Sequence, residues 1–275
     1  MEIENIVDRV ALELGERPVL VSTRSGQPRV GLTTAYAVHI AYDDRTRRRI
    51  TEEADRLQWA AGCGVPVPAV EALTPEWLVT VRAVDDKVTA GRAYISAAID
   101  AARAVSAASR PPPSVRPPVA AHGGGRRAGL QRLSRILRSP LSPAEFRRAR
   151  AAAAPLPRDT LAHGDFMLHN ILFDRSRTAV TIIDWEYLTY APAHTDLLML
   201  WPRLPEADDR DHLLDEVLQS ATDRAALGTL HRWLAIRLLA DLVTKTPQRQ
   251  WDRTRIAQTV RRVAEARANA TAWGA

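Results

Sequence analysis

Three polar side chains between residues 161 and 190 have the types and spacing of a phosphoryl-transfer site. A His-Gly-Asp tripeptide ends at Asp165, Asn170 follows five residues later, and Asp184 comes fourteen residues after that, at the end of an apolar run. In kinases, one carboxylate accepts the proton of the attacking hydroxyl, while an Asn and a second Asp bind the metal ions that bridge the nucleotide phosphates. The hard oxygen ligands of Asn and Asp suit such ions.

Each of these residues also has an ordinary structural interpretation. The sequence allows His163 as a buried core histidine, Asn170 as a turn former and Asp184 as a helix cap. The chemical interpretation is favoured because all the parts occur together, in order and at the expected spacing.

The residues between Asn170 and Asp184 predict a β-hairpin. Two apolar segments, 171–173 and 179–183, flank the polar stretch 174–177, which has the composition of a turn. A hairpin of this kind would bring Asn170 and Asp184 together at its open end.

The segments HGDFMLHN and IIDWE resemble the HGDxxxxN and IDWE motifs of the aminoglycoside phosphotransferase family. This family is the small-molecule branch of the protein-kinase-like fold and includes relatives such as choline and homoserine kinases. The resemblance implies an α+β, bilobal fold with a small sheet-plus-helix amino lobe and a larger, mainly helical carboxy lobe. It also implies that Asp165 is the catalytic base, that Asn170 and Asp184 bind Mg²⁺, and that ATP or GTP is the phosphoryl donor.

The resemblance extends more weakly over most of the chain. It implies an amino lobe over residues 1–84 and a carboxy lobe over residues 85–275, with a Pro- and Gly-rich insertion at about 109–129. Asp196 occupies the position of a structural Asp that braces the catalytic loop, and the adenine is expected against residues 79–84. Trp185 is expected to pack behind Asp184, and Glu186 to orient the loop or reach a second metal ion.

The amino lobe departs from the family pattern at the cation that holds the nucleotide phosphates. Kinase-like enzymes use a strand Lys paired with a helix Glu, but the two lysines of this chain, at 87 and 245, lie elsewhere. With Glu53 as the helix acid, the Lys position falls near His39, which carries charge at neutral pH only if a carboxylate such as Glu53 raises its pKa. Alternatively, an Arg from 45–49 supplies the anchor. Residues 24–27 are compatible with a turn over the phosphates or with an ordinary hairpin turn.

Composition limits the class of protein. The 275 residues are 46% hydrophobic and 25% charged, as in ordinary globular proteins, and the single cysteine excludes an intramolecular disulfide. The absence of a membrane-length apolar segment and of a leader-like amino terminus predicts a soluble, cytoplasmic protein with no membrane partner. The net charge of +6 reflects an Arg-rich middle, interpreted as a solvated surface because no nucleic-acid-binding motif accompanies it.

One strongly acidic segment stands out in this basic chain. Seven acids against one Arg lie between residues 206 and 223, and those at its start are the acceptor-site candidates: Glu206, Asp208, Asp209 and Asp211. In the resembling family, acids in this part of the chain wall the acceptor site, because the substrates are polycations. Apolar residues alternate with these acids at helical spacing, so a solvated helix face is the alternative.

Local patterns predict the helices that surround these sites. One is expected at about 51–63, one at about 90–108, and one from Ser142 with Pro at its first position and Glu145 returning the capping hydrogen bond. A buried helix is expected over residues 227–243 and an amphipathic one over residues 253–270.

Together these features predict a phosphotransferase that uses ATP or GTP and Mg²⁺ to phosphorylate a hydroxyl of a small, cationic molecule. An aminoglycoside-like antibiotic is the favoured acceptor, which would give the protein a function in antibiotic resistance. The alternatives are a kinase for another amino alcohol or sugar, a nucleotide-binding pseudokinase that acts as a regulatory module, and, least favoured, a nucleic-acid-binding protein.

Overall fold

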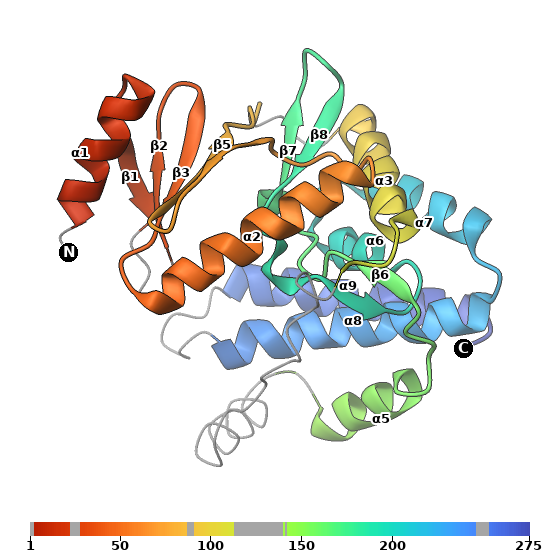
Figure 1. The fold of residues 1–275 in the computed structure, drawn as a ribbon. Coiled ribbons are helices and arrows are strands. Elements are labelled where there is room, and N and C mark those ends of the chain that lie inside the picture. The colour runs from red at the N-terminus through yellow and green to blue at the C-terminus, as the bar shows by residue number, and fades with distance from the viewer. Residues whose placement is uncertain (1–2, 23–27, 87–90, 113–139, 141, 246–252) are drawn as a thin grey trace. The chain divides into compact units, whose positions relative to one another are not determined.

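The computed structural model describes residues 3–22, 28–86, 91–112, 140, 142–245 and 253–275 (Figure 1). The chain forms two compact units. The first comprises Met1–Pro118 with Leu168–Thr189, and the second comprises Val119–Met167 with Tyr190–Ala275. Strands gather in the first unit and helices in the second, which confirms the predicted mixed architecture.

The first unit is built on a five-stranded sheet with the order β1-β2-β3-β5-β4. All neighbouring strands are antiparallel. The chain turns between β2 and β3, and the sequence patterns did not predict β4. The strands are β1 (Val19–Ser22), β2 (Arg29–Leu32), β3 (Tyr36–Ile40), β4 (Val70–Leu73) and β5 (Trp77–Val81).

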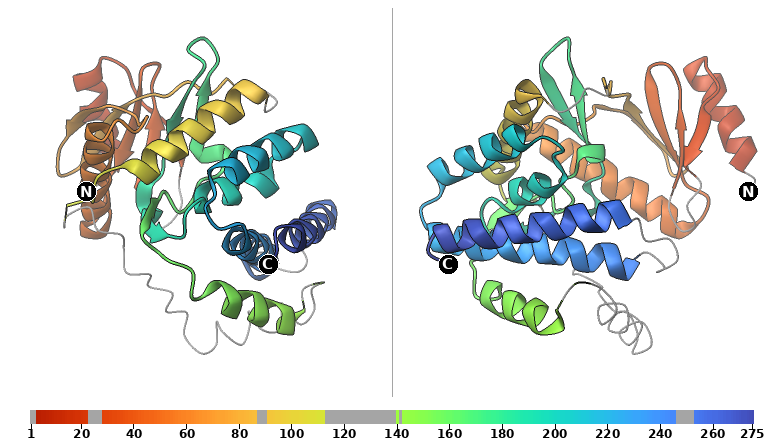
Figure 2. Two further views of the ribbon diagram at one scale, coloured as in Figure 1. Left: turned by 90° about the vertical axis from the view of Figure 1, so that its right-hand side faces the viewer. Right: turned by 180° about the vertical axis from the view of Figure 1, so that it is seen from behind.

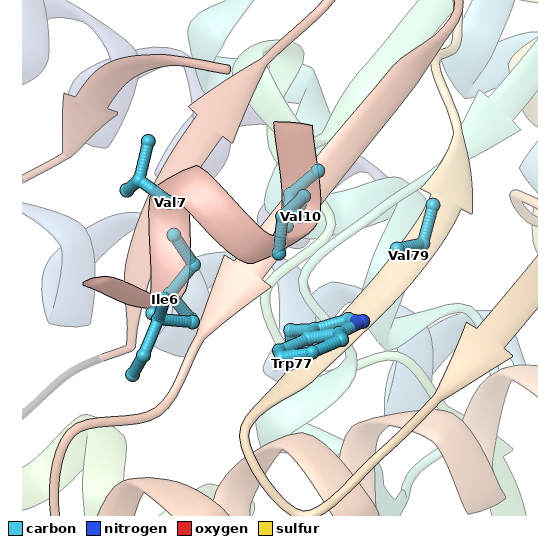
Figure 3. Close-up of a cluster of buried hydrophobic side chains, with 7 residues drawn as sticks. Ile6, Val7, Val10, Trp77 and Val79 are labelled. Carbon is cyan, nitrogen blue, oxygen red and sulfur yellow. The ribbon is translucent and has the colours of Figure 1, made fainter. Parts of the chain in front are cut away.

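Helix α1 (Ile3–Leu14) covers one face of this sheet. Its buried side chains Ile6, Val7 and Val10 pack with Val38, Ile40, Trp77 and Val79 of β3 and β5 (Figure 3). Successive side chains of a strand point to opposite faces. Because Val38 and Ile40 face α1, His39 between them faces the other side of the sheet.

Helix α2 (Asp44–Gly62) contributes to a second cluster of buried residues, in which Ile50 and Ala54 pack with Leu78 of β5. It begins seven residues earlier than the predicted start at Thr51. The reason is a capping box at Asp43: its side chain accepts a hydrogen bond from the Thr46 backbone N–H, and the Thr46 hydroxyl pairs with the Asp43 backbone.

The predicted hairpin is present as β7 (Ile171–Asp174) and β8 (Ala179–Ile182), with Ile171 opposite Ile182. Several contacts attach it to the rest of the first unit. The Ile182 N–H donates to the Pro66 carbonyl at 2.8 Å. Helix α3 (Arg92–Ala107), close to its predicted bounds, packs against β8, and its Tyr94 ring meets Phe173 edge-on at 5.6 Å.

The second unit is mainly helical. Helices α8 (Arg224–Lys245) and α9 (Arg253–Ala272) lie side by side (Figure 2). Gly228 allows this close approach, since a Cβ there would meet Ala275 and Ala270 at 2.9 and 3.0 Å. The other elements are β6 (Thr160–Ala162), which pairs with β9 (Thr189–Ala191), and α5 (Pro143–Ala153), α6 (Thr195–Leu200), η4 (Trp201–Arg203) and α7 (Ala207–Ser220).

The start of α5 corrects one predicted detail. Ser142 caps the helix by accepting from the Glu145 N–H at 3.4 Å, as expected. The Glu145 carboxylate was predicted to return a bond to the cap, but it instead pairs with Arg267 of α9 and lies 3.7 Å from Arg232 of α8. A buried carboxylate beside two guanidinium groups gains more from these charged partners than from a cap.

Three predicted features lie outside the described residues: the turn at 24–27, Lys87, and the insertion beyond residue 112. Within the described part of the chain, every helix is too short or too polar to cross a membrane.

Candidate functional site

The first unit brings His39 and Glu53 together, as the sequence predicts for a pair in the position of the kinase Lys and Glu. His39 faces α2 from the middle of β3, and its Nδ1 lies 3.3 Å from Glu53 Oε2. About a fifth of each side chain is exposed, 20% and 24% respectively. The imidazole therefore holds the helix acid against the sheet.

The interaction between His39 and Glu53 shifts the pKa of both side chains. Burial lowers the pKa of His39, but the charge of Glu53, its hydrogen bond to the ring and the charge of Asp184 together raise that pKa above 6.5. Burial raises the pKa of Glu53, and the charge and hydrogen bond of His39, with help from Arg56, bring it below 4.5. The ion-paired form is favoured, and Asp184 belongs to the same electrostatic group.

The open end of the β7–β8 hairpin joins Asn170 to the residues before Asp184. The Ile183 N–H donates to the Asn170 carbonyl at 2.9 Å, one step beyond the Ile171–Ile182 pair. Asp184 follows with φ 65° and ψ 65°, a left-handed conformation that Asp adopts more readily than most residues. The chain leaves the strand sharply at this residue.

The donor set at this end of the hairpin fits a magnesium ion. Asn170 and Asp184 offer an amide oxygen and a carboxylate, and Mg²⁺ in nucleotide enzymes is held by one or two such groups together with substrate phosphates. Among the described residues, no group of three or more His, Cys, Asp and Glu side chains forms a metal site. The pair of Asn170 and Asp184 is the candidate that the hairpin provides.

The residues after Asp184 are anchored to α2. Trp185 is 1% exposed, donates from Nε1 to the Ile182 carbonyl at 3.0 Å, and meets Trp59 edge-on at 6.5 Å. Glu186 Oε2 lies 3.8 Å from Arg49 Nη1. Trp185 thus packs beneath the turn that carries Asp184, as predicted, while Glu186 reaches an arginine of α2.

In the second unit, Asp196 holds the backbone of the His-Gly-Asp loop. Its Oδ2 accepts from the His163 N–H at 2.7 Å and its Oδ1 from the Gly164 N–H at 3.0 Å. Asp196 is 4% exposed, and burial raises its pKa to about 6 against the two hydrogen bonds, with Asp165 raising it further. This confirms that Asp196 braces the loop. The positive φ of Gly164, 81°, suits a glycine there.

Comparison with known families agrees with these features. The family model of the phosphotransferase enzyme family (APH) matches residues 19–235. The chain belongs to this family. A comparison with curated proteins found no significant match.

Solved structures share the fold of this phosphotransferase along almost its whole length. Amicoumacin kinase hAmiN, in complex with AMP-PNP, Ca²⁺ and Ami, has a TM-score of 0.58 at 13% identity, covering 98% of this chain and 94% of its own. A choline/ethanolamine kinase family protein from Mesorhizobium loti has 0.57 at 18%, covering 98% and 99%. Aminoglycoside phosphotransferase APH(2'')-Ib, bound to ADP, has 0.57 at 14%, covering 98% of each chain. These likenesses show the protein-kinase-like fold.

Family membership makes this phosphotransferase a small-molecule kinase. The residues that match the family model include His39 and Glu53, the His-Gly-Asp loop and the hairpin. The similar structures include kinases for different kinds of small molecule, so the acceptor is not determined by the fold.

Sequence reasoning missed Arg203, an arginine in electrostatic range of Asp165. Burial lowers the pKa of Arg203 to about 10, Asp165 and Asp241 oppose this shift, and Arg255 and Arg237 add to it. Arg203 ends η4, and its Nη1 donates to the Met199 carbonyl. The only advance signal was an Arg seven residues after Asp196 in an otherwise apolar stretch.

The acidic residues proposed for the acceptor divide into two groups. Glu206, Asp208 and Asp211 are exposed at the start of α7, whereas Asp209 is only 8% exposed. Arg210 between them is also buried and donates to the carbonyls of Leu204 and Pro205. Further along, Asp223 caps α8 by accepting from the Ala226 N–H at 2.9 Å, so this acid has a structural function.

Proposed function

We propose that this phosphotransferase transfers the γ-phosphoryl group of ATP or GTP to a hydroxyl of a small, cationic molecule, with aminoglycoside-like antibiotics as the leading class. The observation that supports the proposal is the hairpin register, which brings Asn170 and Ile183, the residue before Asp184, to one end of β7 and β8. In this proposal the side chains of Asn170 and Asp184 are the two oxygen ligands of the metal. Resistance to such an antibiotic is the biological consequence of this choice of acceptor.

Asp165 is the catalytic base in this proposal. Its carboxylate accepts the proton of the acceptor hydroxyl as that oxygen bonds to the γ-phosphorus, and the bond to the β–γ bridging oxygen breaks to release the nucleoside diphosphate. Asp196 supports this step because its two backbone hydrogen bonds fix the loop that carries Asp165.

The first unit supplies the groups for the nucleotide. Asn170 and Asp184 hold Mg²⁺, which when bound neutralises charge on the phosphate oxygens. His39 and Glu53 form the pair at the positions of the Lys and Glu of kinase-like enzymes, and residues 79–84 take the adenine. Residues 1–84 then act as the amino lobe and residues 85–275 as the carboxy lobe. The similar structures with AMP-PNP and ADP support a nucleotide as the donor.

We infer that the acceptor is positively charged from the exposed acidic side chains at the start of α7. Glu206, Asp208 and Asp211 present three carboxylates to solvent in a protein with a net charge of +6. Carboxylates gathered in this way attract and orient a cation, and the effect weakens with salt. Asp209, buried in the same turn, contributes to the local potential rather than by contact with the acceptor.

A kinase for another amino alcohol or for a sugar is the second candidate. Arg203 lies in electrostatic range of Asp165, and Arg237 and Arg255 lie in electrostatic range of Arg203. This positive charge favours an acceptor with less positive charge than an aminoglycoside. The likeness to a choline/ethanolamine kinase family protein supports an amino alcohol. A pseudokinase is disfavoured, since regulation alone requires none of Asp165, Asn170 and Asp184.

ATP consumption across a panel of aminoglycosides, amino alcohols and neutral sugars tests the proposal. We expect a cationic acceptor to be phosphorylated, and replacement of both Asp208 and Asp211 by Asn to raise its KM several-fold without changing the KM for ATP. Asp215→Asn, an exposed acid farther along α7, is the matched control. A neutral best acceptor, or a double variant with an unchanged KM, would move the assignment to the second candidate.

A further inference from the structure

The structure leaves the phosphates of the proposed nucleotide without the strand cation that kinase-like enzymes use. His39 occupies that strand position, but its Nδ1 is directed at Glu53. An imidazole is shorter than a Lys side chain, and its charge falls as pH rises through its pKa. A second, permanent cation on the same side of the sheet would complete this part of the site.

Arg49 of α2 is a candidate for this cation. It stands four residues before Glu53 on α2, and side chains at this spacing lie on one face of a helix. Its guanidinium is 3.8 Å from the carboxylate of Glu186, which follows the proposed metal ligand Asp184 by two residues. Arg49 and Glu53 therefore lie on one face of α2. Arg49 pairs with Glu186, and Glu53 pairs with His39, whose pKa is raised by the charge of Asp184.

The contact between Arg49 and Glu186 is suited to rearrangement. At 3.8 Å it is an ion pair longer than a hydrogen bond, and the side chains are 30% and 34% exposed. Partly exposed pairs of this kind are weak. A guanidinium has five N–H donors and binds phosphate oxygens in a bidentate manner, so a polyphosphate is a stronger partner than the Glu186 carboxylate at 3.8 Å.

The other arginines of α2 have different partners. Arg47 pairs with the Asp44 carboxylate at 3.1 Å, and Arg48 donates from Nε to the Asp44 carbonyl at 3.3 Å. Arg56 is buried beside Glu52, and Arg45 is exposed beside the helix cap. Arg49, by contrast, forms an ion pair with Glu186 in the segment after Asp184.

We propose that Arg49 binds the nucleotide polyphosphate in place of the missing strand Lys, and that Glu186 orients its guanidinium when no nucleotide is bound. This rests on the proposed function, because it assumes that the first unit binds a nucleoside triphosphate. His39 then serves mainly to hold Glu53, and the permanent charge of Arg49 makes phosphate binding largely independent of pH.

Direct binding measurements on the full chain test Arg49 separately from catalysis. We expect Arg49→Met to weaken Mg-ATP binding about tenfold in calorimetric titrations at both pH 6.5 and pH 8.5, as for loss of a charge-assisted hydrogen bond. The loss should be smaller for ADP and absent for adenosine, and Arg49→Lys should restore most of the affinity. Arg48→Met is the matched control, since it removes the same charge from the exposed face of the helix.

The outcomes distinguish this inference from the proposed function. If the parent protein binds no nucleotide, the proposed function fails together with the inference. If the parent binds ATP and Arg49→Met binds it equally well, only the inference is overturned. A parent affinity that falls about tenfold or more between pH 6.5 and pH 8.5 would assign the phosphates to His39. Equal losses in Arg48→Met, or for adenosine, would also overturn it, because they would reflect helix charge or folding rather than phosphate contact.

Discussion

Asp196 in the second unit and Glu53 in the first are both carboxylates that organise a candidate element of the site, but their partners differ in kind. Asp196 is 4% exposed and accepts two backbone hydrogen bonds. The Glu53 side chain is 24% exposed and pairs with the side chain of His39. A backbone donor remains whatever residue carries it, whereas a side-chain partner changes with one substitution. The loop that carries Asp165 thus keeps its backbone donors whatever side chains it has, whereas the pair in the first unit depends on the residue at position 39.

The largest expected effect comes from the loop itself. Asp165→Asn should lower turnover a hundredfold or more, because the amide cannot accept the hydroxyl proton, while nucleotide affinity stays nearly unchanged. Steady-state kinetics with a competent acceptor and calorimetric titration of ATP measure the two quantities. Asp184→Asn should instead weaken binding of the Mg-nucleotide. Equal turnover in Asp165→Asn and the parent would remove the kinase mechanism.

The second-largest effect is expected at Asp196, which holds the backbone of the His-Gly-Asp loop. Asp196→Ala leaves the His163 and Gly164 N–H groups without their carboxylate acceptor, at roughly 1 kcal/mol for each buried donor. We expect the free energy of unfolding in urea to fall by about 2 kcal/mol, and turnover to fall with it. Asp196→Asn keeps one acceptor oxygen and should lose about half as much. If Asp196→Ala has the same free energy of unfolding as the parent, the loop does not depend on the Asp196 carboxylate.

Two buried titratable groups of the second unit, His231 and Asp196, make stability depend on pH in opposite directions. His231 of α8 is fully buried between the Trp201 and Trp273 rings, and burial lowers its pKa to about 4. The unfolded chain binds the proton first, so this group costs stability as pH falls from about 6.5 toward 4. Asp196 acts oppositely, because its folded pKa is raised to about 6 and the folded state gains stability as pH falls.

His231→Phe removes the contribution of His231 to the pH dependence of stability and leaves that of Asp196. The stability of the variant relative to the parent should rise by roughly 1.5 kcal/mol between pH 7 and pH 5, as measured by urea unfolding at each pH. His169→Phe, at a position in the first unit, is a control for loss of an imidazole. A constant difference across this range would contradict the assignment of a neutral His231.

The smallest effect is expected at His39. His39→Ala should weaken ATP binding about threefold near pH 6.5, where the raised pKa keeps the ring charged, and less at pH 8.5, where the parent has lost that charge. His39→Lys should be tolerated or bind ATP more tightly. Titrations at the two pH values measure the change, and an affinity independent of residue 39 at both would leave the phosphates to other cations.

Local sequence signals were sufficient where neighbouring residues decide the structure. Alternating apolar residues around a turn predicted the β7–β8 hairpin, and capping at Ser142 predicted the start of α5. The same signals failed for α2, where the Asp43 capping box was overlooked, and for β4, a short strand whose place depends on pairing with β5. The catalytic functions of Asp165, Asn170 and Asp184 remain predictions.

The sequence by itself determined the family, the order of the motif residues and the absence of a strand Lys, because these depend only on residue types and their spacing. Only the tertiary structure decided which side chains from distant segments meet. The pairing of Arg49 with Glu186, the two bonds of Asp196 and the interaction of Arg203 with Asp165 each join residues far apart in the chain. Such contacts depend on how helices and strands pack, and packing depends on the burial of the whole core rather than on any short segment.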